Sequence, residues 1–195
     1  MANTPRTFVF VDGENLVMRY QAMVEAGAKP KRGVIHIPDV FVWHPDITTW
    51  SCMDIVRVSY YTSATGDQRH LSDLRSRIAS TTFKFSYDPE PSIPQAEAQL
   101  LPRIFHKSPK SRKTRNVDIN IVIDVMRAAH LRDAELIYIL SGDGDYLPLV
   151  EETMRLGKQV YMGAFSSGLS ESLSSNVDLF ELLDDIFFTK QKAEP

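Results

Sequence analysis

Short apolar runs alternate with segments of helical periodicity along this chain. Continuous β-branched and aromatic runs predict buried strands over residues 7–12, 54–62, 136–140 and 160–163. Apolar residues at helical spacing predict helices over residues 15–26, 67–79, 117–131 and 145–156. This order of strands and helices predicts an α/β fold, a three-layer sandwich built on a mainly parallel sheet.

Three segments depart from this alternation. Residues 29–50 combine three prolines with apolar residues, which predicts an inserted hairpin or a long loop. A short strand is expected over residues 83–87, and the proline-containing region from there to Thr114 is expected to be extended or looped. The end of the chain predicts a helix through Phe180, Leu183, Ile186 and Phe187, followed by a flexible tail over residues 190–195.

The composition fits one domain. With 195 residues, 43% of them hydrophobic, the chain can bury a core without staples, and we expect a single domain over residues 1–189. The lone Cys52 excludes an intrachain disulfide framework and is compatible with a reducing compartment. No signal-type block precedes the first strand, and no apolar stretch approaches the ~20 residues that cross a bilayer. We therefore expect a cytoplasmic protein without membrane contact.

Acidic side chains follow two of the predicted strands. Asp12 ends the first strand, and Asp143 and Asp145 follow the strand over residues 136–140. Because the carboxyl ends of parallel strands meet at one edge of a sheet, we expect these acids to lie together, joined by Asp118 at the start of a helix.

Carboxylates held this close need a cation, and oxygen ligands suit Mg²⁺ or Mn²⁺. The pattern therefore predicts a divalent metal site formed by these four aspartates, with Asn15 orienting a ligand or a water. Such an ion can activate water and polarise a phosphoryl group, which points to phosphodiester hydrolysis.

Each of these residues also has a structural interpretation. Asp12 and Asp143 can end their strands through Asx turns, and Asn15 can be a simple cap. Asp145 can cap the helix that it begins, and Asp118 can be an acid favoured by the helix macrodipole.

A basic stretch precedes Asp118. The chain has no acid between Glu97 and Asp118, whereas six cations gather there: Arg103, Lys107, Lys110, Arg112, Lys113 and Arg115. We predict that the last four of these contact a nucleic-acid backbone, the alternative being a solvated surface.

Aromatic residues leave two further questions open. Core or rim packing is favoured over stacking on unpaired bases for Tyr20, Tyr60 and Tyr61. In the insertion, Phe41, Trp43 and Trp50 are predicted to be either the anchors of a possible homodimer or part of an ordinary satellite core.

Three motifs, FVDGEN at residues 10–15, RNVD at 115–118 and SGDGDY at 141–146, resemble in order those of the NYN domain. The resemblance is to the LabA-like group of the PIN-like nuclease superfamily, although relatives often have Lys-Gly where this chain has Arg115-Asn116. It implies a Rossmann-like α/β/α sandwich and Mg²⁺- or Mn²⁺-dependent ribonuclease activity. It also implies metal-site roles for Asp12, Asp118, Asp143 and Asp145, support from Asn15 and Ser141, and a recurrent acid at Asp178.

We therefore predict a metal-dependent nuclease in which the four aspartates catalyse phosphodiester hydrolysis, with single-stranded RNA favoured over DNA as substrate. The main alternative is an NYN-type module that binds RNA or regulates without catalysis. A haloacid-dehalogenase-type phosphatase is disfavoured, because the residues after Asp12 lack the Asp-x-Asp-x-Thr/Val pattern of that class.

Overall fold

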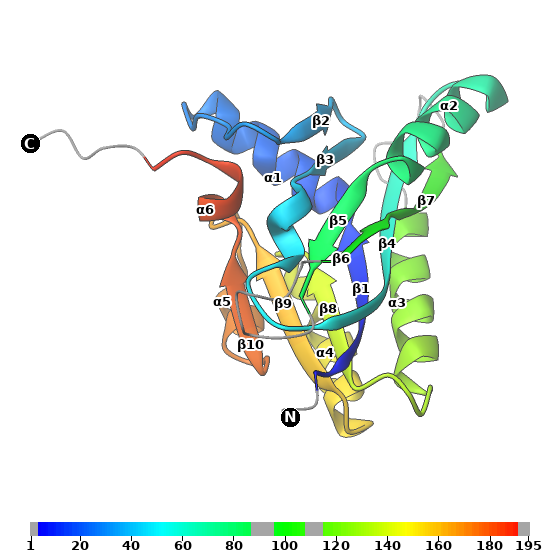
Figure 1. The fold of residues 1–195 in the computed structure, drawn as a ribbon, viewed down its shortest axis with the longest axis vertical. Coiled ribbons are helices and arrows are strands. Elements are labelled where there is room, and N and C mark those ends of the chain that lie inside the picture. The colour runs from blue at the N-terminus through cyan, green and yellow to red at the C-terminus, as the bar shows by residue number, and fades with distance from the viewer. Residues whose placement is uncertain (1–3, 87–95, 108–114, 191–195) are drawn as a thin grey trace, which may run out of the picture.

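A computed structural model of the chain describes residues 4–86, 96–107 and 115–190. Its centre is a parallel sheet of six strands in the order β10-β9-β8-β1-β4-β7 (Figure 1). The strands are β1 (Arg6–Asp12), β4 (Asp54–Ala64), β7 (Leu101–His106), β8 (Leu136–Leu140), β9 (Gln159–Ala164) and β10 (Leu179–Leu182). The predicted α/β class and parallel sheet are confirmed.

Successive residues of a strand point to opposite faces of the sheet, and helices cover both faces. Val9 and Val11 of β1 share a core with the helix that follows, α1 (Gly13–Glu25). Phe10, between them, shares the other core with α3 (Arg115–Ala129) and α4 (Leu147–Arg155). A smaller cluster lies under α2 (Gln68–Ala79), and α5 (Glu171–Ser174) and α6 (Asp184–Phe187) are short. The fold is therefore the predicted three-layer sandwich.

The segment over residues 29–50 contains an antiparallel hairpin, β2 (Ile35–Ile37) with β3 (Phe41–Trp43), which Figure 1 shows beside α1. The 3₁₀ helix η1 (Pro45–Thr48) follows it. Phe41 and Trp43 are buried in the same core as α1 and the sheet, so they form neither a satellite core nor exposed dimer anchors. Trp50 is partly buried, and its indole N–H donates to the Tyr138 hydroxyl at 3.0 Å.

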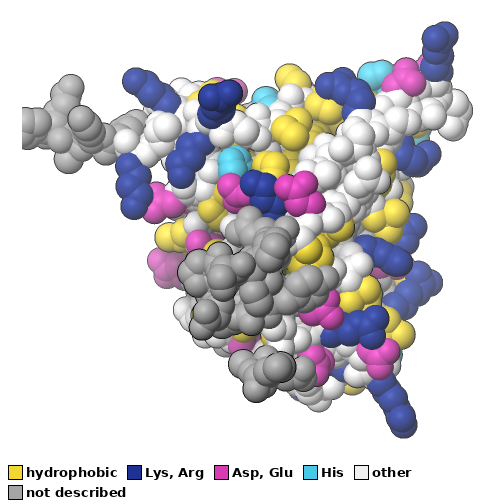
Figure 2. All heavy atoms as spheres, viewed as in Figure 1, with side chains coloured by type: hydrophobic (Ala, Val, Ile, Leu, Met, Phe, Trp, Pro, Cys, Tyr) yellow, Lys and Arg dark blue, Asp and Glu magenta, His cyan; other side chains and the backbone are white. Residues whose placement is uncertain are grey.

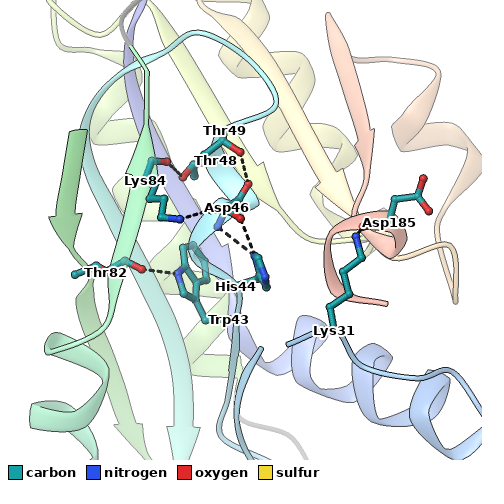
Figure 3. Close-up of polar contacts among 9 residues, drawn as sticks. All are labelled: Lys31, Trp43, His44, Asp46, Thr48, Thr49, Thr82, Lys84 and Asp185. Carbon is teal, nitrogen blue, oxygen red and sulfur yellow. Dashed lines mark hydrogen bonds and ion pairs between the residues drawn. The ribbon is translucent and has the colours of Figure 1, made fainter. Parts of the chain in front are cut away.

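Polar contacts tie this segment to two other parts of the chain (Figure 3). The indole of Trp43 donates to the carbonyl of Thr82 at 3.0 Å, and Lys84 pairs with Asp46 at 2.9 Å. Both partners belong to β5 (Thr82–Phe85), which pairs with β6 (Ala96–Gln99). On the other side, Lys31 donates to the carbonyl of Asp185 in α6.

Two strands of the sheet were not predicted. The region expected to be extended or looped contains β7, whose Pro102 is tolerated because β7 is an edge strand. The terminal helix was wrong over residues 179–182, which form β10. Phe180 packs into one core whereas Leu183 and Phe187 pack into the other, so these apolar residues do not share a helix face.

Candidate active site

The candidate site lies where the order of strands reverses. From β1 the chain adds β4 and then β7 on one side, whereas β8, β9 and β10 extend the sheet on the other side of β1. The crevice beyond the carboxyl ends of strands at such a point is the usual ligand site of an open α/β sheet. Here Asp12 ends β1, and Ser141 follows β8.

Asp12 is only 3% exposed, and hydrogen bonds fix both of its oxygens. Its Oδ1 accepts the backbone N–H of Asn15 at 3.0 Å, which caps α1. Its Oδ2 accepts the Ser141 hydroxyl at 3.1 Å, while the side-chain oxygen of Asn15 accepts the N–H of Gly142 at 3.1 Å. Asp12 therefore does cap a helix, but its second oxygen and Asn15 also join the ends of β1 and β8.

Tyr146 connects Asp12 to Asp118. Its hydroxyl lies 3.4 Å from Asp12 Oδ2 and 3.4 Å from Asp118 Oδ1, and its single proton can be donated to one of them at a time. Burial, together with the charges of Asp12, Asp118 and Asp143, raises the pKa of Tyr146, so the hydroxyl stays protonated. Tyr146 is not among the predicted site residues, although it directly follows Asp143 and Asp145 in the SGDGDY motif.

The electrostatics of Asp12 are unfavourable to its charged form. The pKa of Asp12 is raised to about 7; burial is the largest cause, and the charges of Asp118 and Glu14 contribute to the increase. The hydrogen bonds from Asn15 and Ser141 offset part of this increase. A nearby cation would favour the carboxylate, as the predicted metal site requires.

Asp143 and Asp145 have different surroundings, although both follow β8. Asp143 is half-buried, and its Oδ1 accepts the N–H of Asp145 at 3.1 Å, which caps the 3₁₀ helix η2 (Gly144–Tyr146). Asp145 is exposed, and α4 begins at Leu147 without a side-chain cap. The interpretation of Asp145 as a helix cap is therefore wrong, because Asp143 caps η2 and no side chain caps α4.

A pocket of about 870 Å³ lies at the carboxyl end of β1 and extends along α1 toward the hairpin. Asp12, Asp118 and Asp143 line it, whereas Asp145 is not among its lining residues. Glu14, which is not among the predicted site residues, also lines the pocket and accepts a hydrogen bond from the Ser63 hydroxyl. The remaining described lining residues are Asn15, Val17, Met18, Gln21, Ala22, Glu25, Asp39, Val40, Ser63, Ala64, Thr65 and Lys107.

The donor chemistry of this pocket fits Mg²⁺ or Mn²⁺. Its carboxylates are hard oxygen ligands, and a bound cation would oppose the burial and the charges of Asp118 and Glu14 that raise the pKa of Asp12. In the described part of the chain, no three His, Cys, Asp or Glu side chains gather closely enough to enclose an ion. Mg²⁺ does not need such a cage, because it is usually held by one or two carboxylates, waters and substrate phosphates.

The predicted basic contacts lie mostly outside the described residues. Lys110, Arg112 and Lys113 lie outside the described residues. Arg115 is described and is the first residue of α3. On the face shown in Figure 2, the described Lys and Arg side chains lie mainly along the margins, and one near the centre lies between acidic side chains.

Other acidic and aromatic side chains of the chain have structural partners. Asp178 precedes β10, and its Oδ2 accepts the N–H of Val160 near the start of β9. This contact lies at the amino ends of the strands, whereas Asp12 lies at the carboxyl end of β1. Asp124 accepts the Tyr61 hydroxyl at 2.8 Å and pairs with Arg127 at 3.1 Å. The prediction of core packing is confirmed for Tyr20, Tyr60 and Tyr61, the three tyrosines considered for base stacking, because all three are buried.

Across the described ranges of the chain, none of the helices combines the length and apolarity that crossing a membrane requires.

Comparisons with known proteins agree with this geometry. The NYN domain family matches residues 6–184. A crystal structure of a protein of unknown function from Vibrio parahaemolyticus RIMD 2210633 superposes with a TM-score of 0.56 at 18% identity. That alignment covers 97% of this chain and 99% of the other and shows a shared fold. No curated protein matches the sequence.

Proposed function

We propose that this chain, which belongs to the NYN domain family of the PIN-like nuclease superfamily, is a metal-dependent ribonuclease. The observation that carries the proposal is the convergence of Asp12, Asp118 and Asp143 around Tyr146 at the switch point of the sheet. A buried carboxyl group with a raised pKa in a cleft is typical of a functional site. The finer placement in the LabA-like group stays a prediction.

One or two of the pocket acids Asp12, Asp118 and Asp143 would hold Mg²⁺ or Mn²⁺, together with waters and substrate phosphates. Asn15 and Ser141 fix the orientation of Asp12 through the bonds described above. When bound, such an ion supplies activation of water and stabilisation of charge on the phosphoryl oxygens. Asp145 belongs to the predicted set, but its exposure outside the pocket supports a smaller contribution.

The proposed substrate is single-stranded RNA. Lys107, which lines the pocket, precedes the segment that contains Lys110, Arg112, Lys113 and Arg115, and we propose that these cations hold the phosphate backbone. The preference for RNA over DNA is inferred from the family.

A non-catalytic RNA-binding or regulatory module is the second candidate. It is favoured by the protein hydrogen bonds that already occupy both oxygens of Asp12. In such a module the acids would stabilise the crevice without turning over substrate.

Cleavage of end-labelled single-stranded RNA and DNA distinguishes the two. The wild type with Mn²⁺ should cut RNA and should stop when EDTA is added, whereas Asp143→Asn should cut far more slowly. Cleavage that persists in EDTA, or that Asp143→Asn leaves unchanged, would contradict the proposed chemistry. RNA binding without cleavage would favour the non-catalytic module.

A further inference from the structure

The pocket continues well beyond the acids that would hold an ion. From Asp12 it runs along the exposed side of α1, past Met18 and Gln21, to Asp39 and Val40 at the turn of the hairpin. Its volume of about 870 Å³ lies in the range of small-ligand sites, roughly 300–1,000 Å³. This distal part, lined by Met18, Ala22, Glu25, Asp39 and Val40, is not used by the proposed chemistry.

The distal part offers an apolar surface. Met18, Ala22 and Val40 line it, and Met18 is 53% exposed although it adjoins the core helix residue Val17. A flexible thioether side chain adapts to flat, polarizable groups and makes favourable contacts with aromatic rings.

Its polar groups are mostly negative. The described lining of the whole pocket contains six carboxylates and one cation, Lys107. Beyond the three acids proposed for the ion site, Glu14, Glu25 and Asp39 remain. Since exposed charges act over a Debye length of about 8 Å at physiological salt, phosphates are repelled from the distal part unless a cation neutralises it.

The hairpin wall is held in place before any ligand binds. The side-chain amide of Gln21 donates to Asp39 Oδ1 at 3.0 Å, and its oxygen accepts the N–H of Asp39 at 2.8 Å. The same oxygen lies 3.2 Å from Nε2 of His36 in β2. A preformed wall of this kind reduces the ordering cost of binding.

We propose that the distal part of the pocket binds one unpaired nucleoside next to the phosphate that lies over Asp12, Asp118 and Asp143. Met18, Ala22 and Val40 would contact the base, while Glu25 and Asp39 would accept hydrogen bonds from sugar hydroxyls or base amino groups. The backbone phosphates would then leave the site on the side away from the hairpin. This inference rests on the proposed function for its neighbouring phosphate but can be tested without turnover.

The seven methionines provide a direct reporter. Protein with ¹³C-labelled methionine methyl groups is titrated with adenosine and, separately, with adenosine 3′,5′-bisphosphate, both without metal. The Met18 signal, assigned with Met18→Leu, should shift with adenosine, whereas the signal of Met154, exposed on α4 outside the pocket, should not. The bisphosphate should bind more weakly than adenosine, because the carboxylates repel it.

A matched pair of variants tests the location. Met18→Trp should weaken adenosine binding by about tenfold or more by filling the pocket, whereas Met154→Trp should leave it unchanged. Melting temperatures of both variants establish that they are folded. If Met18→Trp unfolds the protein, Glu25→Lys replaces it and should tighten bisphosphate binding relative to adenosine.

Three results would overturn the inference: no shift of the Met18 signal with adenosine, equal effects of the two tryptophan variants, or tighter metal-free binding of the bisphosphate. Wild-type RNA cleavage together with any of these would leave the proposed function standing. Adenosine binding at Met18 without RNA cleavage would instead contradict the proposed function alone.

Discussion

At the scale of single residues, the site is organised around the buried charge of Asp12. The sequence predicted that Asp12 ends a strand and that Asn15 and Ser141 support the site. Tyr146 was not identified because its role depends on distance: its hydroxyl meets Asp12 and Asp118, which are 134 and 28 positions away. Asp145 is among the predicted site residues and Glu14 is not, because spacing alone does not show which acid faces the pocket.

The raised pKa of Asp12 predicts how stability depends on pH. Between about pH 4 and its folded pKa of about 7, the folded state binds more protons than the unfolded state. The free energy of unfolding of the metal-free protein should therefore fall as pH rises through this window, by at most about 1.4 kcal/mol per unit from this group. Urea unfolding at several pH values should show a shallower fall for Asp12→Asn, and equal slopes for both proteins would refute the shift.

Tyr146→Phe removes the hydroxyl that lies between two proposed metal-holding carboxylates. Loss of a hydrogen-bond donor beside such ligands typically costs about 10–100-fold in metal affinity, so calorimetric titration with Mn²⁺ should show weaker binding. Tyr61→Phe is the matched control, because it removes a hydroxyl bonded to Asp124, away from the pocket. Equal Mn²⁺ affinities for the two variants would argue against the role of Tyr146.

At the scale of elements, the pattern located the inner strands better than the outer ones. β1, β4, β8 and β9 carry continuous apolar runs because both of their faces are covered. The strands β7 and β10 lie at the edges, where proline and exposed residues interrupt such runs. The helix starts at the site were identified because acids and glycine mark them.

Gly13 sets how closely α1 approaches the sheet. A methyl group there would press on the ring of Tyr60 and lie 2.6 Å from the backbone oxygen of Tyr61. Gly13→Ala should therefore lower the free energy of unfolding by roughly 1–3 kcal/mol, as overpacking usually does. An unchanged urea midpoint would show that α1 can move without cost.

At the scale of the whole molecule, one fold joins residues that are far apart in sequence. The strand order brings Asp12, Asp118 and Ser141 to one crevice, and this followed from the alternation of strands and helices. How the hairpin closes over α1 did not follow, since it depends on side-chain contacts such as Gln21 with Asp39.

We predict that the hairpin segment and the sheet unfold as one unit, because Trp43 is buried in a core shared with β1, β4 and β8. Tryptophan fluorescence reports Trp43 and Trp50, whereas far-ultraviolet circular dichroism reports the helices and sheet. The urea midpoints of the two signals should coincide. An earlier fluorescence transition would mean that the segment over residues 29–50 is a separate unit.

The central claim is that Asp12 anchors a metal-dependent nuclease site, and the single-turnover rate of RNA cleavage tests it most directly. Wild type, Asp12→Asn and Asp133→Asn are compared with Mn²⁺. Asp133 is the control, an exposed aspartate whose ion pair with Arg6 contributes little to stability. The account predicts a loss of about 100-fold or more for Asp12→Asn and a wild-type rate for Asp133→Asn; equal rates for all three proteins would contradict it.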